Sequence, residues 1–248
     1  PHEPHAGARA LVAALLRRAD AVLAHSPALA AQARDLGARA VEVVALPPHL
    51  PGGVPPFERR EGRFGARLAV LALGIVREYK GVDLLLQAAA GVPDVEVCVA
   101  GELWGDAGEQ VRRRAEDARL AGRVEILPGY VAAQEIPGLL ARHDVLAMTY
   151  RSATASQNAL LAFAHGMPVL ASDVGTFGAQ VRDGVDGVLV PAGDVGALER
   201  ALRTFCAPGA LERLQAGVRP VDLDAPWRAY VRVLTGAGAR GGRGAGDD

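Results

Sequence analysis

Segments with the pattern of β-strands alternate with segments patterned as α-helices along most of the chain, and this alternation constrains the fold more than any other feature. Every residue from 68 to 73 is apolar, which is typical of a strand covered on both faces. Short connections between successive strands and helices favour a parallel sheet with helices on both sides. We therefore predict an α/β fold with a Rossmann-like, doubly wound parallel sheet.

The hydrophobic periodicity of the longer, second part of the chain places its individual elements. We expect strands over residues 68–73, 95–100, 124–127, 144–149, 169–172 and 188–190. We expect helices over residues 82–90, 110–120, 136–142, 157–165 and 195–206.

The first 50 residues show only two strand patterns, 21–24 and 41–46, with helices expected over 11–18 and 27–36. Ser26 and Pro27 form a helix start, because serine caps helices and proline suits the first helical position. Two parallel strands cannot cover their own faces or edges. They either extend a sheet whose other strands are missing from this chain or pack on the main domain, and we favour the first arrangement.

These patterns divide the chain into consecutive parts. Residues 1–50 are expected to be the end of a truncated N-terminal Rossmann-like domain, and 51–65, rich in Pro and Gly, a linker. Residues 66–207 are expected to form the main, ligand-binding domain, and 208–235 the region of a C-terminal helix that crosses back onto the first domain. The Gly- and Arg-rich residues 236–248 are expected to be a disordered tail.

The composition narrows the choice of partners and location. A net charge of −1 provides no strong basic field, which argues against nucleic acid. Cys98 lies in an apolar run and is expected to be a reduced, buried thiol. His2, Glu3 and His5 lack the spacing that places two imidazoles on one helical face, so we expect no metal site. We find no run of 18 apolar residues and no signal peptide, which favours a cytoplasmic location.

The loop over residues 74–81 follows the apolar strand, and ligands of open parallel sheets bind outside the carboxyl ends of strands. Gly74 lets a backbone approach closely, and Arg77 and Lys80 lie beside a helix start. Cations next to exposed N–H groups suit a diphosphate. The alternative interpretation is a solvated turn with ordinary surface charges.

Two further loops follow later strands. Ser156, Gln157 and Asn158 precede a helix, where small, hydroxylic residues let backbone donors face an anion and the helix dipole adds positive potential. The alternative is a helix merely capped by Ser156. Gly175 permits a tight turn or the close approach of a ligand. The alternative is an ordinary connecting loop. Together the three loops predict a phosphate-bearing ligand. The absence of GxGxxG and GxxxxGK[ST] motifs disfavours dinucleotide dehydrogenases and P-loop enzymes.

The motifs in these loops resemble the C-terminal domain of glycosyltransferase family 4, the glycosyl transferases group 1. The matching segments, which keep the family's order and spacing over roughly residues 68–205, are ALG (72–74) with KG (80–81), VAG (99–101), GMPVLAS (166–172), VG (174–175) and RDGVDGVLVPAGD (182–194). ADAVLAHS (19–26) resembles the last strand–helix unit of the family's N-terminal domain. APW (225–227) and the following helix resemble the terminal helix that crosses back onto that domain, with Trp227 as its apolar anchor.

This resemblance implies a GT-B architecture of two Rossmann-like domains facing across a cleft. The C-terminal domain binds the nucleotide diphosphate of a sugar donor, and the N-terminal domain binds most of the acceptor. Lys80 is expected to contact the donor phosphates, the amides around Ser156 and Gln157 to cradle them, and Tyr130 and Val131 to flank the base. The cationic side chain and the backbone amides would then stabilise the leaving diphosphate as negative charge develops on it.

The same resemblance implies a retaining glycosyltransferase of the hexosyltransferase type, acting in polysaccharide biosynthesis with no metal or other cofactor. Its partners would be a nucleotide-sugar donor and a glycan, lipid-linked or other acceptor. It leaves room for peripheral membrane association of the full-length protein. Catalytic residues on the acceptor side are expected upstream of Pro1, so the chain by itself is expected to be incomplete and inactive.

Several positions depart from the family's pattern. Ile75 occupies the place of the usual arginine, for which Arg77 is the candidate replacement. The family's two glutamates fall on Ala153 and Leu161. The second glutamate normally binds the ribose hydroxyls of the donor, which leucine cannot do. The loop instead resembles that of a subgroup with a Ser-Ala-Thr-rich sequence at this place. A non-catalytic binding or partner protein that has lost donor contacts is therefore one alternative function, and a nucleotide-sugar epimerase is another. A phosphorylase is disfavoured, because it would need a cofactor lysine in a much longer chain.

Overall fold

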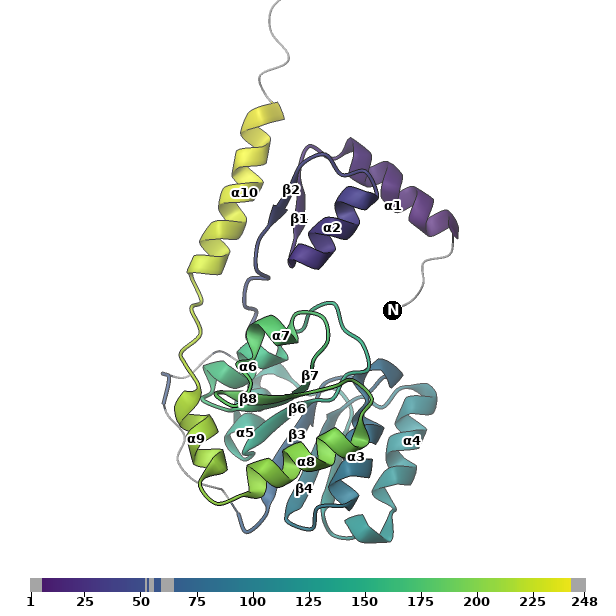
Figure 1. Ribbon diagram of the computed structural model, residues 1–248, viewed down its shortest axis with the longest axis vertical. Helices are drawn as coiled ribbons and strands as arrows, with labels where there is room; N and C mark the ends of the chain where they lie inside the picture. The colour runs from purple at the N-terminus through teal and green to yellow at the C-terminus, as the bar shows by residue number, and fades with distance from the viewer. Residues whose placement is uncertain (1–5, 52, 54–55, 59–64, 242–248) are drawn as a thin grey trace, which may run out of the picture. The chain divides into compact units, whose positions relative to one another are not determined.

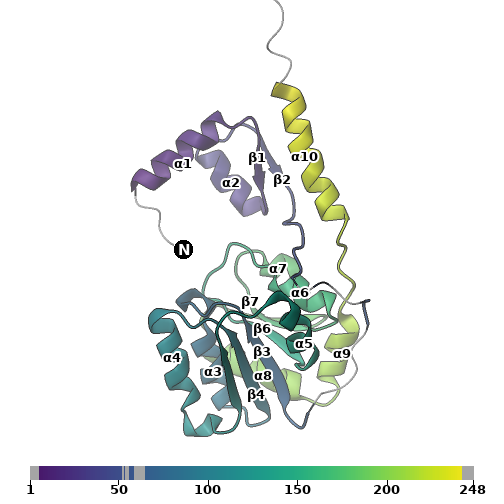
Figure 2. The same cartoon turned by 180° about the vertical axis from the view of Figure 1, so that it is seen from behind.

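A computed structural model describes residues 6–51, 53, 56–58 and 65–241 (Figure 1 and Figure 2). The chain divides into two compact units, one formed by residues 49–221 and the other by residues 1–48 with 222–248. Residues 52, 54–55 and 59–64 of the expected linker lie outside the described residues.

The larger unit is built on a six-stranded, all-parallel sheet with the order β5-β4-β3-β6-β7-β8. Its strands are β3 (Leu68–Leu73), β4 (Val95–Gly101), β5 (Val124–Pro128), β6 (Val145–Met148), β7 (Val169–Ser172) and β8 (Gly187–Val190). The predicted α/β fold class is confirmed.

Helices cover both faces of this sheet (Figure 1 and Figure 2). One apolar cluster receives side chains from α3 (Val82–Ala90), α4 (Gly105–Ala115), α8 (Val195–Cys206) and α9 (Ala210–Gly217). The opposite cluster receives them from α5 (Ile136–Ala141), α6 (Asn158–Ala164) and α7 (Phe177–Gln180). Because strand side chains alternate between faces, Val70 of β3 enters the first cluster and Leu71 the second. The core therefore has two layers, one on each side of the sheet.

The structure corrects the helix expected over residues 110–120. That segment is the end of α4 followed by a separate 3₁₀ turn, η2 (Ala118–Leu120). The break occurs at Asp117, whose side chain accepts a hydrogen bond of 2.9 Å from the Arg119 amide and starts the new turn. Sequence patterns also missed α7 and α9. Leu211 and Leu214 of α9 are core residues of the larger unit, so the part of 208–235 that precedes residue 222 belongs to that unit.

The smaller unit contains α1 (Ala6–Arg18), β1 (Val22–Ala24), α2 (Pro27–Asp35), β2 (Val41–Val43) and α10 (Ala225–Gly241). Strands β1 and β2 are parallel. Ser26 caps α2 by accepting a 3.2 Å hydrogen bond from the Leu29 amide, with Pro27 at the first helical position, as the sequence predicts. That these two strands extend a larger sheet stays a prediction.

Helix α10 is joined to the N-terminal segment of the smaller unit. The Trp227 indole donates a 3.1 Å hydrogen bond to the Pro48 carbonyl, and Tyr230 stacks on His25. Trp227 thus contacts the N-terminal segment through its indole N–H, while 46% of the residue stays exposed. Helix α10 ends at Gly241, within the expected tail of residues 236–248, and residues 242–248 lie outside the described residues.

Candidate functional site

The sheet of the larger unit reverses its strand order between β3 and β6. From β3 the chain moves outward through β4 to β5, then returns beside β3 as β6 and continues to β8. Ligands of open α/β sheets bind at such a reversal, outside the carboxyl ends of the strands. The loops that leave these two strands, residues 74–81 and 149–157, therefore frame the candidate site.

The two loops are joined by backbone and side-chain contacts. Gly81 has φ 61°, and a Cβ there would lie 2.1 Å from the Thr149 carbonyl oxygen, so glycine is required. Thr149 Oγ1 donates to the Gly81 carbonyl at 2.9 Å. The Arg151 guanidinium makes two hydrogen bonds, 2.6 and 2.8 Å long, to the Asp83 carboxylate, and its amide donates to the Tyr79 carbonyl. These contacts hold the loops in one arrangement.

Lys80, in the 3₁₀ turn η1 (Glu78–Lys80), provides a cation at this edge and is the only lysine of the sequence. No carboxylate of the described residues lies within ion-pair distance of its ammonium. Burial, and secondarily the charge of Arg77, lowers the Lys80 pKa to about 8. A half-buried ammonium without a counter-ion is costly and favours binding of an anion.

Arg77 lies on the face of the Trp104 ring, with Cζ 4.3 Å from the ring centroid. This is the geometry of a cation–π contact. The Trp104 indole donates a 2.7 Å hydrogen bond to Glu102 Oε2. The Arg77 side chain of the first loop is therefore held by Trp104, a residue of the loop after β4.

Gly74 adopts φ 100°, and the predicted close backbone approach occurs, but to the protein itself. A Cβ on Gly101 of β4 would lie 2.3 Å from the Gly74 carbonyl oxygen. A Cβ on Gly74 would lie 3.0 Å from Lys80 Nζ, so glycine here also leaves room for the ammonium.

The predicted cradle residues have different roles in the loop before α6. Asn158 Nδ2 donates to the Leu73 carbonyl at the end of β3 at 3.2 Å, and Gln157 Oε1 accepts from the His49 amide. Ser156 Oγ accepts from the Asn158 amide at 3.3 Å. Within the described residues, the amide N–H groups of Thr154, Ala155 and Ser156 donate to no other group. Side chains thus brace the loop, while these amides stay available as donors.

Ser156 directly precedes Gln157, which has helical backbone angles and makes no side-chain capping bond. Ser156 Oγ accepts the amide of Asn158 at the start of α6, which is the bond that a capping serine makes. The structure therefore leaves the interpretation of Ser156 as a helix cap in place. Ser156 also forms a hydrogen bond with Tyr150, which opposes the rise of the Tyr150 pKa to about 12 that burial produces.

Gly175, on the loop after β7, also permits a close approach, and again the partner is protein backbone. Its φ is 58°, and a Cβ would lie 2.5 Å from the Ala153 carbonyl oxygen. The third loop therefore supports the second from behind rather than contributing a polar side chain of its own.

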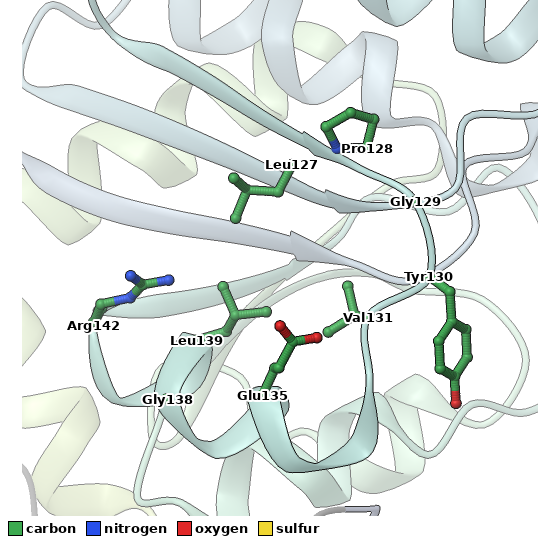
Figure 3. Close-up of a pocket in the computed structure, with 9 residues that line it drawn as sticks. All are labelled: Leu127, Pro128, Gly129, Tyr130, Val131, Glu135, Gly138, Leu139 and Arg142. Carbon is green, nitrogen blue, oxygen red and sulfur yellow. The ribbon is translucent and has the colours of Figure 1, made fainter.

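Tyr130 and Val131 lie at a cavity of about 440 Å³ between β5 and α5 (Figure 3). Its lining residues, which combine an apolar floor with one acid and one base, are Leu127, Pro128, Gly129, Tyr130, Val131, Glu135, Gly138, Leu139 and Arg142. In Figure 3 the side chains of Leu127, Val131 and Leu139 point toward one another, whereas Tyr130 stands at the rim and is 79% exposed. Strands lie about 4.8 Å apart, so β5 is roughly 10 Å from β3. The cavity and Lys80 thus lie at the carboxyl ends of different strands of the same sheet.

The two positions that depart from the family's glutamates offer no polar side chain. Leu161 is 3% exposed and packs in the apolar cluster beneath α6, and Ala153 packs against the same cluster. Contacts to a ligand in this loop must therefore come from its backbone or from neighbouring residues.

Sequence patterns missed Trp104 and Thr149 as parts of the site, and they assigned no role to Arg151, the first residue of the second predicted loop (151–158). Trp104 could have been suspected as a large aromatic residue directly after a buried strand, where ligands approach. The roles of Thr149 and Arg151 depend on contacts with residues about 70 positions away in the sequence, which a local pattern does not reveal.

Metal and membrane signals are absent from the described part of the chain. No three His, Cys, Asp or Glu side chains in residues 6–51, 53, 56–58 and 65–241 are placed to hold a metal ion. None of the helices described has the length and apolar character needed to span a bilayer. Neither Cys98 nor Cys206 forms a disulfide bond, and burial raises the Cys98 pKa to about 12.

The larger unit is a Rossmann-like domain with a candidate anion site at the switch point of its sheet. The family model for glycosyl transferases group 1 matches residues 67–207. The chain belongs to this family, as the motifs of its loops indicated. It is 32% identical over 152 residues to a D-inositol 3-phosphate glycosyltransferase of Mycobacterium sp. (strain KMS), covering 60% of this chain and 34% of that protein. The enzyme of that name from Mycobacterium bovis is 30% identical over 176 residues, covering 66% of this chain and 36% of the relative. The chain thus spans about a third of the length of these relatives.

Solved structures share the fold. Sucrose-phosphate synthase from Thermosynechococcus elongatus superposes with a TM-score of 0.76 at 21% identity, covering 95% of this chain and 63% of that one. HepE from Anabaena, solved in complex with UDP and glucose, superposes with a TM-score of 0.77 at 20% identity, covering 93% of this chain and 67% of that one.

Proposed function

We propose that this chain binds the diphosphate of a nucleotide-sugar donor and serves a glycosyltransferase that moves the sugar, with retention of anomeric configuration, to a glycan, lipid-linked or other acceptor. The transferred group would be a hexose, in the synthesis of a polysaccharide in the cytoplasm. Family membership supports the sugar-transfer class, and the site supports the diphosphate.

The observation that carries the proposal is the state of Lys80. Every other basic residue among the 27 Lys and Arg is an arginine, and the one lysine lies at the switch point without a carboxylate partner in the described residues. Lysine provides a compact charge with three donors, which suits phosphate oxygens at several angles. The amides of Thr154, Ala155 and Ser156 can complete the site on the other loop.

These residues also suggest how the reaction is assisted. Breaking the bond between the sugar and the diphosphate leaves negative charge on the departing phosphate oxygens. Lys80 and Arg77 are positioned to stabilise that charge, and a fixed cation needs little reorganisation during the reaction. In this proposal the two cations carry out the charge neutralisation without a metal ion.

The cavity beside Tyr130 is proposed to take the nucleoside. It lies on the same sheet edge as Lys80, two strands away, so an extended nucleoside diphosphate can place its base there and its phosphates at the switch point. Apolar walls from Leu127 and Leu139 suit a base, and Glu135 can accept hydrogen bonds. UDP is the first probe to use, since HepE was solved with it.

Calorimetric titration of the chain with UDP, GDP, ADP and inorganic pyrophosphate tests this proposal. We expect one nucleoside diphosphate to bind in the micromolar range, binding to be lost in Lys80→Ala, and Lys80→Arg to restore it only partly. The matched control is Arg200→Ala, which removes an exposed cation on α8. Equal loss in the control would contradict a specific role for Lys80.

A second candidate function is that of a non-catalytic partner protein that has lost its donor contacts. It is favoured by the burial of Leu161 at the place where the family has a ribose-binding glutamate. This alternative predicts no binding of any nucleoside diphosphate in the same titration. An epimerase would instead convert a nucleotide sugar without an acceptor, which product analysis detects.

A further inference from the structure

The residues around Arg77 form an arrangement that the donor site alone does not explain. Past Gly74 and Gly101, the chains of β3 and β4 stay paired: the Val76 amide donates to the Glu102 carbonyl at 2.7 Å, and the Trp104 amide donates to the Val76 carbonyl at 3.3 Å. This pairing brings Arg77 and Trp104 to adjoining loop tips.

Trp104 is 48% exposed, and its position is fixed by one hydrogen bond of the indole and by the packing of the preceding residue. Glu102 accepts the 2.7 Å hydrogen bond from Nε1, which orients the plane of the ring. The preceding Leu103 packs against Gly108 of α4, where a Cβ would lie 2.8 Å from Leu103 Cβ. A long arginine side chain at a surface loses considerable rotamer entropy when it is held in place. If the Trp104 ring already holds Arg77, ligand binding has less of this entropy cost to overcome.

Arg77 forms no ion pair with a carboxylate of the described residues. The contact with the Trp104 ring is therefore what restrains the Arg77 guanidinium. We propose that Trp104 is a positioning residue for the diphosphate site, whose ring holds the Arg77 guanidinium beside Lys80 so that two cations meet the ligand together. This inference rests on the proposed function, and Glu102 acts in it through the orientation of the indole.

A ligand-free measurement tests the positioning itself. Lys80 is the only lysine, so lysine labelled with ¹³C at the ε carbon gives one signal whose shift with pH reports the Lys80 pKa. Arg77 and Tyr150 are the ionisable groups that face Lys80, and Tyr150 stays neutral because its pKa is about 12. We expect Arg77→Gln to raise the Lys80 pKa above about 8, since it removes a neighbouring positive charge.

The double-mutant cycle decides between positioning and mere packing. Trp104→Leu should raise the Lys80 pKa as Arg77→Gln does, and the double variant should raise it no further. Trp104→Phe, which keeps an aromatic ring under Arg77, should leave the Lys80 pKa close to its wild-type value. Trp227→Leu, at the second tryptophan, should leave the Lys80 pKa unchanged. An unchanged Lys80 pKa in Trp104→Leu, or additive effects in the double variant, would overturn the proposal.

Binding of the diphosphate provides the second measurement. Trp104→Leu should weaken the best-binding nucleoside diphosphate, or inorganic pyrophosphate, about ten-fold, as expected for one displaced charge-assisted contact. Arg77→Gln should weaken it similarly. If wild type binds none of these ligands, the donor function fails while the pKa cycle still tests the positioning role of Trp104. If Trp104→Leu binds as tightly as wild type, the positioning role fails while the donor function stands.

Discussion

Gly175 lies directly against the carbonyl oxygen of Ala153, so near that a Cβ on Gly175 would stand 2.5 Å from it. The same Cβ would lie 2.8 Å from the Thr154 carbonyl oxygen. Two loops that follow neighbouring strands β6 and β7 are thus packed backbone to backbone. Gly175 thus supports the backbone of the loop whose amides are proposed to bind the diphosphate.

Gly175→Ala should therefore destabilise the chain and distort the anion site. The left-handed φ of 58° and the contact with Ala153 together predict a loss of about 2 kcal/mol or more in the free energy of unfolding. Nucleoside diphosphate affinity should fall as well. Gly184→Ala is the matched control: its φ is 71° but nothing lies within 4 Å, so only about 1 kcal/mol should be lost. Urea unfolding and calorimetry measure both effects, and equal losses in the two variants would disprove the packing role.

The pH dependence of ligand binding should report on Lys80. Its pKa of about 8 means that the ammonium form, which attracts a diphosphate, predominates below pH 8 and disappears as the pH rises through that value. The affinity should accordingly be constant from pH 6.5 to about 7.5 and decline above 8. In Lys80→Arg this decline should vanish, because arginine stays charged. A wild-type profile that is flat to pH 9.5 would contradict the role of Lys80.

Binding of the diphosphate should not depend on a divalent cation. Lys80 and Arg77 are proposed to neutralise the phosphates, and the described residues contain no cluster of metal ligands. Titrations with excess EDTA and with Mg²⁺ should give affinities within about two-fold of each other. A loss of affinity in EDTA that Mg²⁺ restores would show that a metal ion contributes.

The ion pair between Arg151 and Asp83 should stabilise the loops in a pH-dependent way. Burial acts to raise the Asp83 pKa, but the hydrogen bonds and charge of Arg151 together bring it below its usual 3.8. A depressed carboxyl pKa contributes stability above pH 4 that is lost as the pH falls further. Because both side chains are partly exposed, we expect Asp83→Asn to lose only about 1 kcal/mol at pH 7 and less at pH 3.

Urea unfolding at both pH values measures this difference. The control Glu109→Gln removes an exposed carboxylate of α4 and should shift the unfolding midpoint little at either pH. If the effect of Asp83→Asn were the same at pH 7 and pH 3, the loss would come from packing rather than from charge.

Much of the larger unit could be predicted because its signals are local. A fully apolar strand such as β3 needs cover on both faces, and its bounds, like those of α3, β7 and α8, agree with the sequence pattern. Helix α9 was missed because only its packing reveals it: Leu211 and Leu214 are ordinary apolar residues until they meet the core. The end of α4 was misplaced because Asp117 competes for the backbone, which periodicity does not register.

The sequence by itself determined the α/β fold class, the family and the loops where a phosphate should bind, because hydrophobic period, Gly placement and motif order are properties of short segments. The tertiary structure alone decided what the individual residues do. It joined the Asn158 side-chain amide to the Leu73 carbonyl, placed Gly175 against the Ala153 carbonyl, and set Trp104 under Arg77. These relations join residues from different strand ends, and they exist only once the parallel sheet brings its carboxyl ends together.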